Sequence, residues 1–144
     1  MRVILSPFSR VLRELRMRHG MRQGDLADAM GYEQTYISAL EIGTKGPPTA
    51  EFTERAISAL KLCPAEQAEL RTAAAASERQ IKLRNDMPEA LFWMVSELRD
   101  HLETLHPAQV TLIREIIGMR ARLAESPPVE LHRIRKRPRS EATM

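Results

Sequence analysis

Apolar residues recur at helical spacing through most of this 144-residue chain. The first such segment begins at Ser6 and Pro7, which are typical of an N-cap and a first helical position, and it ends near His19. Its apolar face consists of Phe8, Val11, Leu12 and Leu15. Strand-like alternation never persists for more than a few residues, so the pattern predicts an all-helical fold.

Two short helices joined by a tight turn are predicted between residues 23 and 42. Apolar positions three and four residues apart mark both helices: Leu26, Ala27 and Met30 in the first, Ile37 and Leu40 in the second. Gly31 follows the first helix directly and can adopt a positive φ that reverses the chain. This arrangement predicts a helix-turn-helix, whose second helix lies in the major groove of DNA.

Several spaced residues of this region agree with one family pattern at once: Leu15-Arg16, Gly20-Met21-Arg22-Gln23, Leu26-Ala27, Gly31, Ile37-Ser38, Leu40-Glu41 and Gly43. On these residues, the segment 16–43 resembles the DNA-binding domain of phage-repressor and Cro-type regulators, also called XRE-like. The resemblance extends weakly to Leu60. It implies that Arg16 pairs with Glu41 at the end of the recognition helix, and that Gln23 braces this helix.

The second helix of the motif is predicted to start near Glu33 or Gln34 and to present its N-terminal end to the bases. The candidate base-contacting residues are Gln34, Thr35, Tyr36, Ser38 and Ala39. An amide such as that of Gln34 can bond adenine bidentately, and Thr35 and Ala39 can offer methyl groups to thymine. For Tyr36, a contact to sugar or phosphate and a role as a partly exposed packing residue remain equally open.

Candidate phosphate contacts lie on both sides of this helix: Arg22, Gln23, Thr44 and Lys45. The backbone N–H and side-chain amide of Gln23 open a helix, where the helix dipole favours an anion. A plain helix-start role is the alternative for Gln23. Lys45 and its neighbouring N–H groups belong to a turn-rich loop at 43–48.

Two further helices complete a predicted five-helix, repressor-like domain over residues 1–83. The first is capped by Thr49, and its core positions are Phe52, Ala56, Ile57 and Leu60. The second starts at Cys63-Pro64 and is expected to run for about 20 residues, or ~30 Å, along a narrow stripe: Leu70, Ala73, Ala74, Ser77 and Ile81. Cys63 is expected to be a buried small residue rather than a reactive thiol.

Residues 84–88 break the helical pattern, and a heptad seam follows: Leu91, Val95, Leu98, Leu102 and Leu105. His106-Pro107 ends this helix and starts another, which is apolar over a broad face. Two facing helices bury only one apolar stripe each, so the apolar surface that is left over implies a partner. We therefore predict a helical hairpin over 84–125 that forms a homodimer through the following residues: Leu91, Val95, Leu98, Leu102, Leu105, Ile113, Ile116 and Ile117.

The net charge of +3 is unevenly distributed along the chain. Counting Lys and Arg against Asp and Glu gives +2 for 1–62, −2 for 63–125 and +3 for 126–144. The middle is therefore a poor nucleic-acid surface, and 126–144 is typical of a disordered basic tail. One cysteine excludes an internal disulfide, and no apolar run approaches ~20 residues. We expect a cytoplasmic protein that does not contact membranes.

No catalytic constellation is visible in the sequence. The histidines, His19, His101, His106 and His132, are not spaced from each other or from Cys63 as metal ligands are. A glycine-rich phosphate loop and a serine elbow are also missing from the sequence. We therefore expect no enzyme, no metal and no cofactor.

The sequence thus favours a regulator that binds double-stranded DNA, most simply a repressor that binds a palindromic operator as a dimer. That the protein represses transcription, rather than activating it, is implied by the family resemblance alone. One alternative is an antitoxin-type module, in which the C-terminal helices bind another protein and DNA binding is secondary. Another is a phage or plasmid maintenance protein. The operator, the regulated genes and any effector are not encoded in these patterns.

Overall fold

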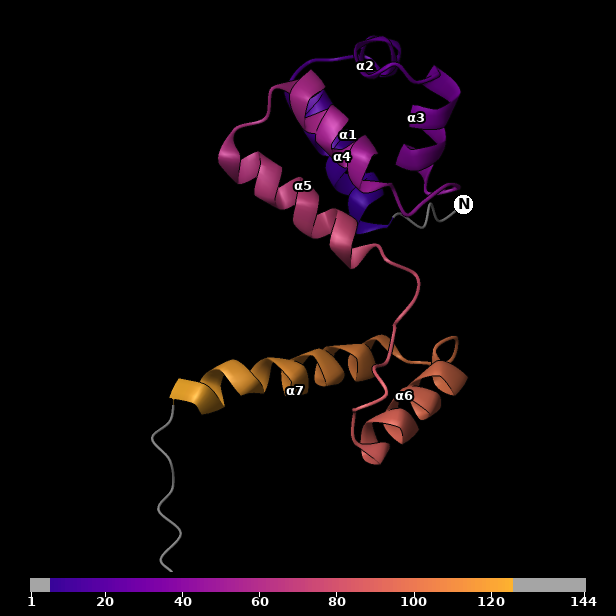
Figure 1. The fold of residues 1–144 in the computed structure, drawn as a ribbon, viewed down its shortest axis with the longest axis vertical. Helices are drawn as coiled ribbons and strands as arrows, with labels where there is room; N and C mark the ends of the chain where they lie inside the picture. Colours follow the sequence, from indigo (N-terminus) through magenta and orange to yellow (C-terminus); the bar gives the residue numbers. More distant parts are fainter. Residues whose placement is uncertain (1–5, 126–144) are drawn as a thin grey trace, which may run out of the picture. The chain divides into compact units, whose positions relative to one another are not determined.

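The computed structural model describes residues 6–125 and divides the chain into two compact units, 1–82 and 83–144. All regular secondary structure in the described part is α-helical, which confirms the predicted all-α class. The first unit contains α1 (Pro7–Arg18), α2 (Gln23–Met30), α3 (Gln34–Ile42), α4 (Ala50–Leu60) and α5 (Pro64–Ala76). The second contains α6 (Glu89–His101) and α7 (Pro107–Glu125) (Figure 1).

One hydrophobic core with side chains from all five helices holds the first unit together. The predicted apolar faces of α1 to α4 are buried in it, as expected from their spacing. Phe8 and Phe52 meet edge to face with ring centroids 6.1 Å apart, so α1 and α4 pack directly on each other. Leu70 and Ala73 bring α5 onto the same core.

The helix ends follow the local chemistry of the sequence. Ser6 accepts a hydrogen bond from Ser9 N–H at 3.2 Å and begins α1, and Thr49 accepts one from Phe52 N–H at 3.1 Å and begins α4. Gly31 ends α2 in the left-handed conformation at φ 74°. The turn between α2 and α3 is therefore short, as the pattern predicted.

The expected length of the fifth helix was wrong, because α5 has 13 residues and stops at Ala76. Ser77 is buried, and its hydroxyl donates to the Ala73 carbonyl at 2.7 Å while accepting the N–H of Phe8 at 2.9 Å. One side chain thus satisfies both the end of α5 and the start of α1. Ile81, placed on the predicted stripe, lies beyond the helix with 73% of its surface exposed.

The expected burial of Cys63 was also wrong, since its side chain is exposed. Cys63 is the N-cap of α5, and its N–H donates to the Glu66 carboxylate at 3.3 Å. The preceding residue, Leu62, takes the buried position. An N-cap lies at the outer end of its helix, where a small side chain can remain exposed.

The second unit is a helical hairpin whose two helices diverge from the turn between them (Figure 1). No residue of α6 is buried, and the exposed fractions of Leu102, Ile116 and Ile117 are 59%, 67% and 71%. A groove of about 570 Å³ lies between the helices, with Leu98, Leu105 and Ile113 among its lining residues. Of the predicted seam, Leu102 is exposed and the other four residues are half-buried, so the seam is only partly covered within one chain.

Within residues 6–125, no helix is both long and apolar enough to cross a bilayer. The predicted basic tail at 126–144 lies outside the described residues.

Candidate nucleic-acid interface

The predicted recognition helix, α3, buries one face and exposes the other. Its buried residues are Ile37, Leu40 and Glu41, at helical spacing. In Figure 1, α2 and α3 lie at the rim of the first unit, with α3 at its right-hand edge. Helix α3 therefore presents its opposite face to solvent, as a helix that enters a groove must.

Glu41 connects α3 to both preceding helices. Its carboxylate accepts hydrogen bonds from Nε and Nη2 of Arg16, the second at 3.1 Å, and from the side-chain amide of Gln23. Arg16 also donates to the Met21 carbonyl at 2.8 Å. Only 3% of the Glu41 side chain and 13% of the Arg16 side chain are exposed. The pair that the resemblance implied is thus present, and it is shielded from water.

A second buried contact fixes the same end of α3. The hydroxyl of Ser9 on α1 donates to the Leu40 carbonyl, and Ser9 is 1% exposed. This contact was not predicted from the sequence, although the hydroxyl of Ser9 beside the apolar face of α1 was a visible signal. Because buried polar groups are found with partners, a buried serine at this position indicates a neighbouring backbone acceptor.

The exposed face of α3 carries most of the predicted base-contacting residues. Gln34 and Thr35 are exposed, and Ser38 and Ala39 are half-buried. Ile42, which the analysis counted only as the end of the motif, continues the row three residues after Ala39 with 51% of its surface exposed. This row is uncharged, with one amide, two hydroxyls and aliphatic groups, and the exposed carboxylate of Glu33 adjoins it, accepting from the Thr35 hydroxyl at 3.5 Å.

The side chain of Gln34 lies against the beginning of α2. A Cβ atom placed on Gly24 would be 3.6 Å from Oε1 of Gln34. The glycine therefore leaves room for the amide beside the first turn of α2. Gln34 is part of the exposed face of α3, and its amide lies beside the N-terminus of α2. Both of these features are predicted to contact DNA.

Tyr36 differs from the other candidates because its ring is part of an aromatic cluster. It stacks on Tyr32 with centroids 5.3 Å apart and meets Phe52 edge to face at 5.6 Å. Packing, one of the two possibilities left open, therefore describes its ring. Sequence spacing could not separate the two, since Tyr36 is half-buried at the flank of α3.

The phosphate candidates before α3 divide into two roles. Arg22 is exposed and is the N-cap of α2, where its side chain makes no capping hydrogen bond. The first N–H groups of α2 thus have no side-chain cap, which suits an anion. The side-chain amide of Gln23 instead donates to Glu41. Of the two groups of Gln23 that were proposed to contact phosphate, only the backbone N–H remains a candidate.

The candidates after α3 also divide into two roles. Both the hydroxyl and the N–H of Thr44 donate to the Ala39 carbonyl, at 3.2 and 3.0 Å, and the N–H of Lys45 donates to the same oxygen at 3.3 Å. Thr44 therefore caps the end of α3 and has no donor left for a phosphate. The Nζ of Lys45 lies 5.4 Å from the ring centre of Tyr36 and keeps its role as a candidate.

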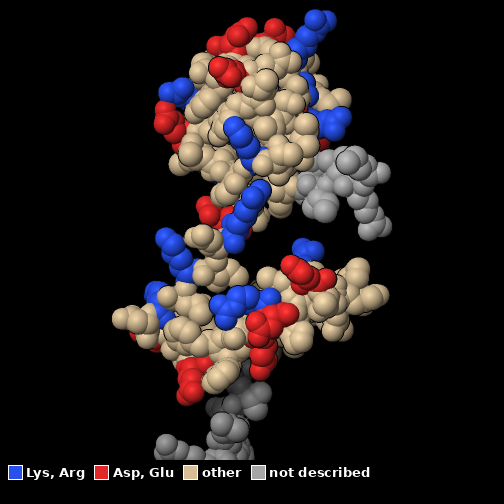
Figure 2. All heavy atoms as spheres, turned by 90° about the vertical axis from the view of Figure 1, so that its right-hand side faces the viewer, with Lys and Arg blue, Asp and Glu red and all other residues tan. Residues whose placement is uncertain are grey.

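Charge is sparse on this side of the molecule. Figure 2 faces the side that carries α3 in Figure 1, and most of the upper unit's surface is tan. Lys and Arg side chains stand at separate points, and acidic side chains gather toward the top and the left edge. On such a surface, the few separate Lys and Arg side chains can contact phosphates and position the protein, while uncharged groups contact the bases.

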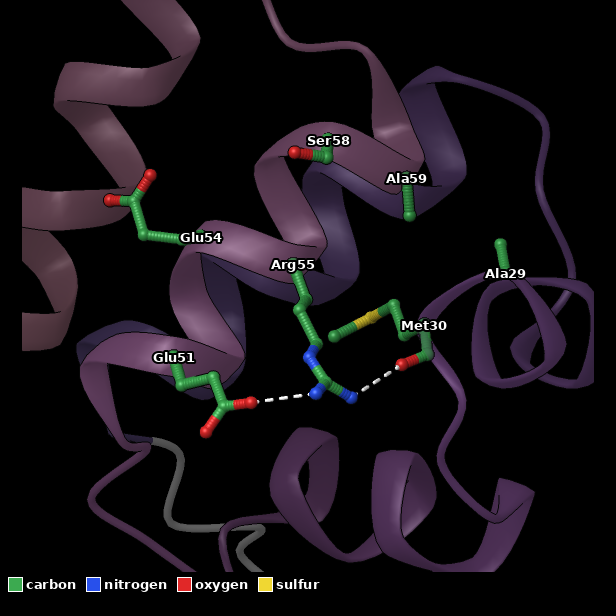
Figure 3. A pocket seen from close by; sticks show the side chains of 7 residues that line it. All are labelled: Ala29, Met30, Glu51, Glu54, Arg55, Ser58 and Ala59. Carbon is green, nitrogen blue, oxygen red and sulfur yellow. Dashed lines mark hydrogen bonds and ion pairs between the residues drawn. The ribbon is translucent and has the colours of Figure 1, made fainter.

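A hollow of about 530 Å³ lies between α2 and α4, and the charged side chains that line it are engaged in hydrogen bonds within the fold (Figure 3). Arg55 crosses it and donates to the Met30 carbonyl at 3.1 Å and to Glu51 at 2.6 Å. The Arg71 guanidinium, which hydrogen-bonds Glu54, lowers the pKa of that carboxyl. Arg55 thus connects α4 to α2, and Arg71 connects α5 to α4. Among residues 6–125, no cluster of three or more His, Cys, Asp or Glu could hold a metal.

Comparison with known proteins agrees with this geometry. Residues 7–70 match a family model described as a helix-turn-helix domain. No curated protein matches the chain. The predicted N-terminal helix-turn-helix of the XRE and Cro-like kind is therefore confirmed, while the match leaves out the end of α5 and the whole second unit.

Proposed function

We propose that this chain, whose residues 7–70 form a helix-turn-helix domain, is a homodimeric transcriptional regulator that recognises a palindromic operator and represses. The observation that carries the proposal is the support of α3 by Arg16, Gln23 and Ser9, which bond its last turn. This support leaves the opposite face free. A rigid helix with a free polar face is what groove recognition requires.

Base recognition in this proposal rests on uncharged groups. Gln34 bonds an adenine, while Thr35 and Ala39 contact thymine methyl groups, and Ile42 adds an aliphatic contact at the end of the row. Ser38 bonds a base edge or a sugar. Arg22, the first N–H groups of α2 and Lys45 position the head on phosphates. Because few charges are involved, the sequence preference should depend on amide, methyl and shape contacts.

The second unit supports the dimer. Helices of this length owe most of their stability in water to packing of an apolar face, yet α6 has no buried residue. Burying one Leu or Ile side chain contributes about 1.5–3 kcal/mol, so covering several of them stabilises an assembly substantially. A second copy brings an identical seam, and self-complementary faces of this kind give two-fold dimers.

A second candidate function rests on the same groove. An antitoxin-type protein would use the open face between α6 and α7 to bind a helix of another protein, with DNA binding secondary. Copurification of a stoichiometric small protein with the full-length chain would favour this alternative. In both versions the protein is not an enzyme, uses no cofactor and acts in the cytoplasm.

Selection of bound fragments from random DNA tests the main proposal. Full-length protein should enrich an inverted repeat whose half-sites are about one helical turn apart, near ~34 Å. Enrichment of a single half-site would contradict dimeric recognition but keep the reading helix. No enrichment, with weak binding to every duplex, would contradict sequence-specific regulation. Transcription from a promoter that contains the selected site then tests whether the protein represses.

A further inference from the structure

The chain after α5 returns to the loop that follows the recognition helix. The post-α5 segment, residues 77–82, starts at buried Ser77, which is bonded to both α1 and α5. Two residues later, Nη2 of Arg79 lies 3.8 Å from where a Cβ atom on Gly46 would be. Gly46 has a φ of 148°, a conformation that strains other residues, so the loop backbone approaches the guanidinium without a side chain between them.

Among the described residues, no carboxylate forms an ion pair with Arg79. The other arginines of the first unit mostly form ion pairs within the unit: Arg10 with Glu14, Arg16 with Glu41, Arg18 with Glu66, Arg55 with Glu51 and Arg71 with Glu54. Within the described residues, no such ion pair involves Arg79 or Lys82, and both side chains are exposed. Arg79 and Lys82, three residues apart on the post-α5 segment, are therefore exposed cations without an ion pair to a described residue, and exposed Glu78 precedes Arg79 in the chain.

The neighbouring loop directs its own cation toward the recognition helix. Lys45 precedes Gly46, and its Nζ lies over the ring of Tyr36 in the first turn of α3. Arg79 adjoins the same loop one residue further along. In Figure 2, Lys and Arg side chains are visible on the lower part of the unit's α3-bearing side.

We propose that Arg79 is a DNA phosphate contact, that it extends the contact made by Lys45, and that Lys82 adds a weaker one behind it. The inference rests on the proposed DNA binding and adds a site to it. Residue 79 lies beyond the family match at 7–70. It also lies within 63–125, where the net charge of −2 argued against a nucleic-acid surface, so the proposal revises that expectation for the start of this stretch.

Phosphate is the partner that this chemistry favours. A guanidinium without a carboxylate can bond two phosphate oxygens at once. A base contact is less suitable, because Arg79 adjoins the loop after α3 rather than the exposed face of the helix. Residues 78–82 have no regular secondary structure, and Ser77 fixes where they begin, so the guanidinium of Arg79 is held beside the loop from that end.

The test is the salt dependence of binding to a random-sequence DNA duplex by the full-length protein. Each phosphate contact contributes close to one unit to the slope of log K against log salt concentration. Arg79→Gln should lower this slope by about 1 for each bound protomer, and Arg79→Lys should retain it. Arg10→Gln removes the same charge from the groove between α1 and α5 and should leave the slope unchanged.

The outcomes separate this inference from the proposed function. If the wild type binds with a salt-dependent affinity and Arg79→Gln keeps the wild-type slope, the Arg79 contact is overturned and DNA binding stands. An equal decrease in slope for Arg10→Gln would mean that net charge matters rather than position, which also overturns it. If the wild type does not bind duplex DNA, both proposals fail. Circular dichroism of each variant checks that the fold is intact.

Discussion

Arg16 and Glu41 lie 25 residues apart in the chain, and two guanidinium N–H groups of the first meet both carboxylate oxygens of the second. This pair joins the last turn of α1 to the last turn of α3. Since Gln23 donates to the same carboxylate, the three helices that form the recognition region meet at one buried acid. The orientation of α3 therefore depends on this contact.

Removal of one partner from this pair should be strongly destabilising. Arg16→Ala leaves the Glu41 carboxylate buried with only Gln23 as a side-chain partner, and breaking a buried pair costs about 3–5 kcal/mol. Chemical unfolding followed by circular dichroism measures the change. Arg10→Ala is the matched control, because its partner Glu14 and Arg10 itself are both about half exposed, and the expected loss is below ~1 kcal/mol. Equal losses for both variants would contradict the role assigned to Glu41.

Two substitutions should separate base contacts from phosphate contacts. Gln34→Ala should lose about 1–3 kcal/mol of discrimination at one base pair of the selected site, because the bidentate bond to adenine is gone. Lys45→Ala should weaken binding to all sequences and lower the salt slope by about 1 for each bound protomer. Titrations with the selected site and with single-base variants measure both effects. If Gln34→Ala reduced affinity equally for every sequence, Gln34 would not be a base contact.

Glu66 should make stability depend on pH in acid. Hydrogen bonding from His19, and then from Cys63, lowers the pKa of Glu66 from 4.5 to about 2. Between these values the unfolded chain binds the proton more readily than the folded one. The stabilising contribution of Glu66 is thus fully present above pH 4.5, and it is lost as the pH falls toward 2.

Variants at both ends of this contact give the measurement. Between pH 4.5 and 2, the free energy of unfolding should fall less steeply for Glu66→Gln than for the wild type. His19→Ala removes the main cause of the lowered pKa of Glu66, so the free energy of unfolding should also fall less steeply in this pH range. Urea unfolding at several pH values tests this, and wild-type steepness in both variants would refute it.

The helix-turn-helix was predictable because its determinants are local. Apolar spacing set the buried faces of α2 and α3, and Gly31 set the turn between them. The pairing of Arg16 with Glu41 was not local, but the resemblance implied it. Residues whose partners are close in sequence, or whose family role is specific, were therefore the ones that the sequence located well.

The errors arose where a distant partner determines the local structure. The stripe that suggested a long fifth helix contains Ser77, and nothing near it in sequence reveals that its hydroxyl accepts the N–H of Phe8. Likewise, the aromatic partners of Tyr36 come from α4 and from the turn before α3. The contacts of Ser77 and Tyr36 follow from the packed fold. Thr44 differs, because its partner, the Ala39 carbonyl, is only five residues away, and its donors cap the end of α3.

The last prediction concerns the state of association, because the second unit leaves an apolar groove and several large apolar side chains exposed within one chain. Its apolar groove between α6 and α7 and its exposed isoleucines are the surfaces that a second copy would cover. One recognition helix contacts only a few base pairs, so a single head should bind weakly. Two linked heads gain affinity through the high effective concentration of the second head.

Deletion of everything after Arg84 should therefore leave a folded head that contains the pair of Arg16 and Glu41, yet reduce operator affinity by orders of magnitude. Leu98→Asp should have the same effect in the full-length chain, since it places a charge in the groove that the partner would cover. Thr111→Asp adds the same charge at an exposed position of α7 outside the groove lining and should leave association intact.

Sedimentation of the full-length protein at micromolar concentration decides between the two uses of the second unit. We expect a dimer for the wild type and for Thr111→Asp, and a monomer for Leu98→Asp. The fluorescence of Trp93, the single tryptophan, reports on the same helix. If the wild type is a monomer, or if the truncated head dimerises and binds DNA as tightly as the whole chain, then the groove has another occupant. The antitoxin-type alternative, in which a foreign helix fills it, would then gain support.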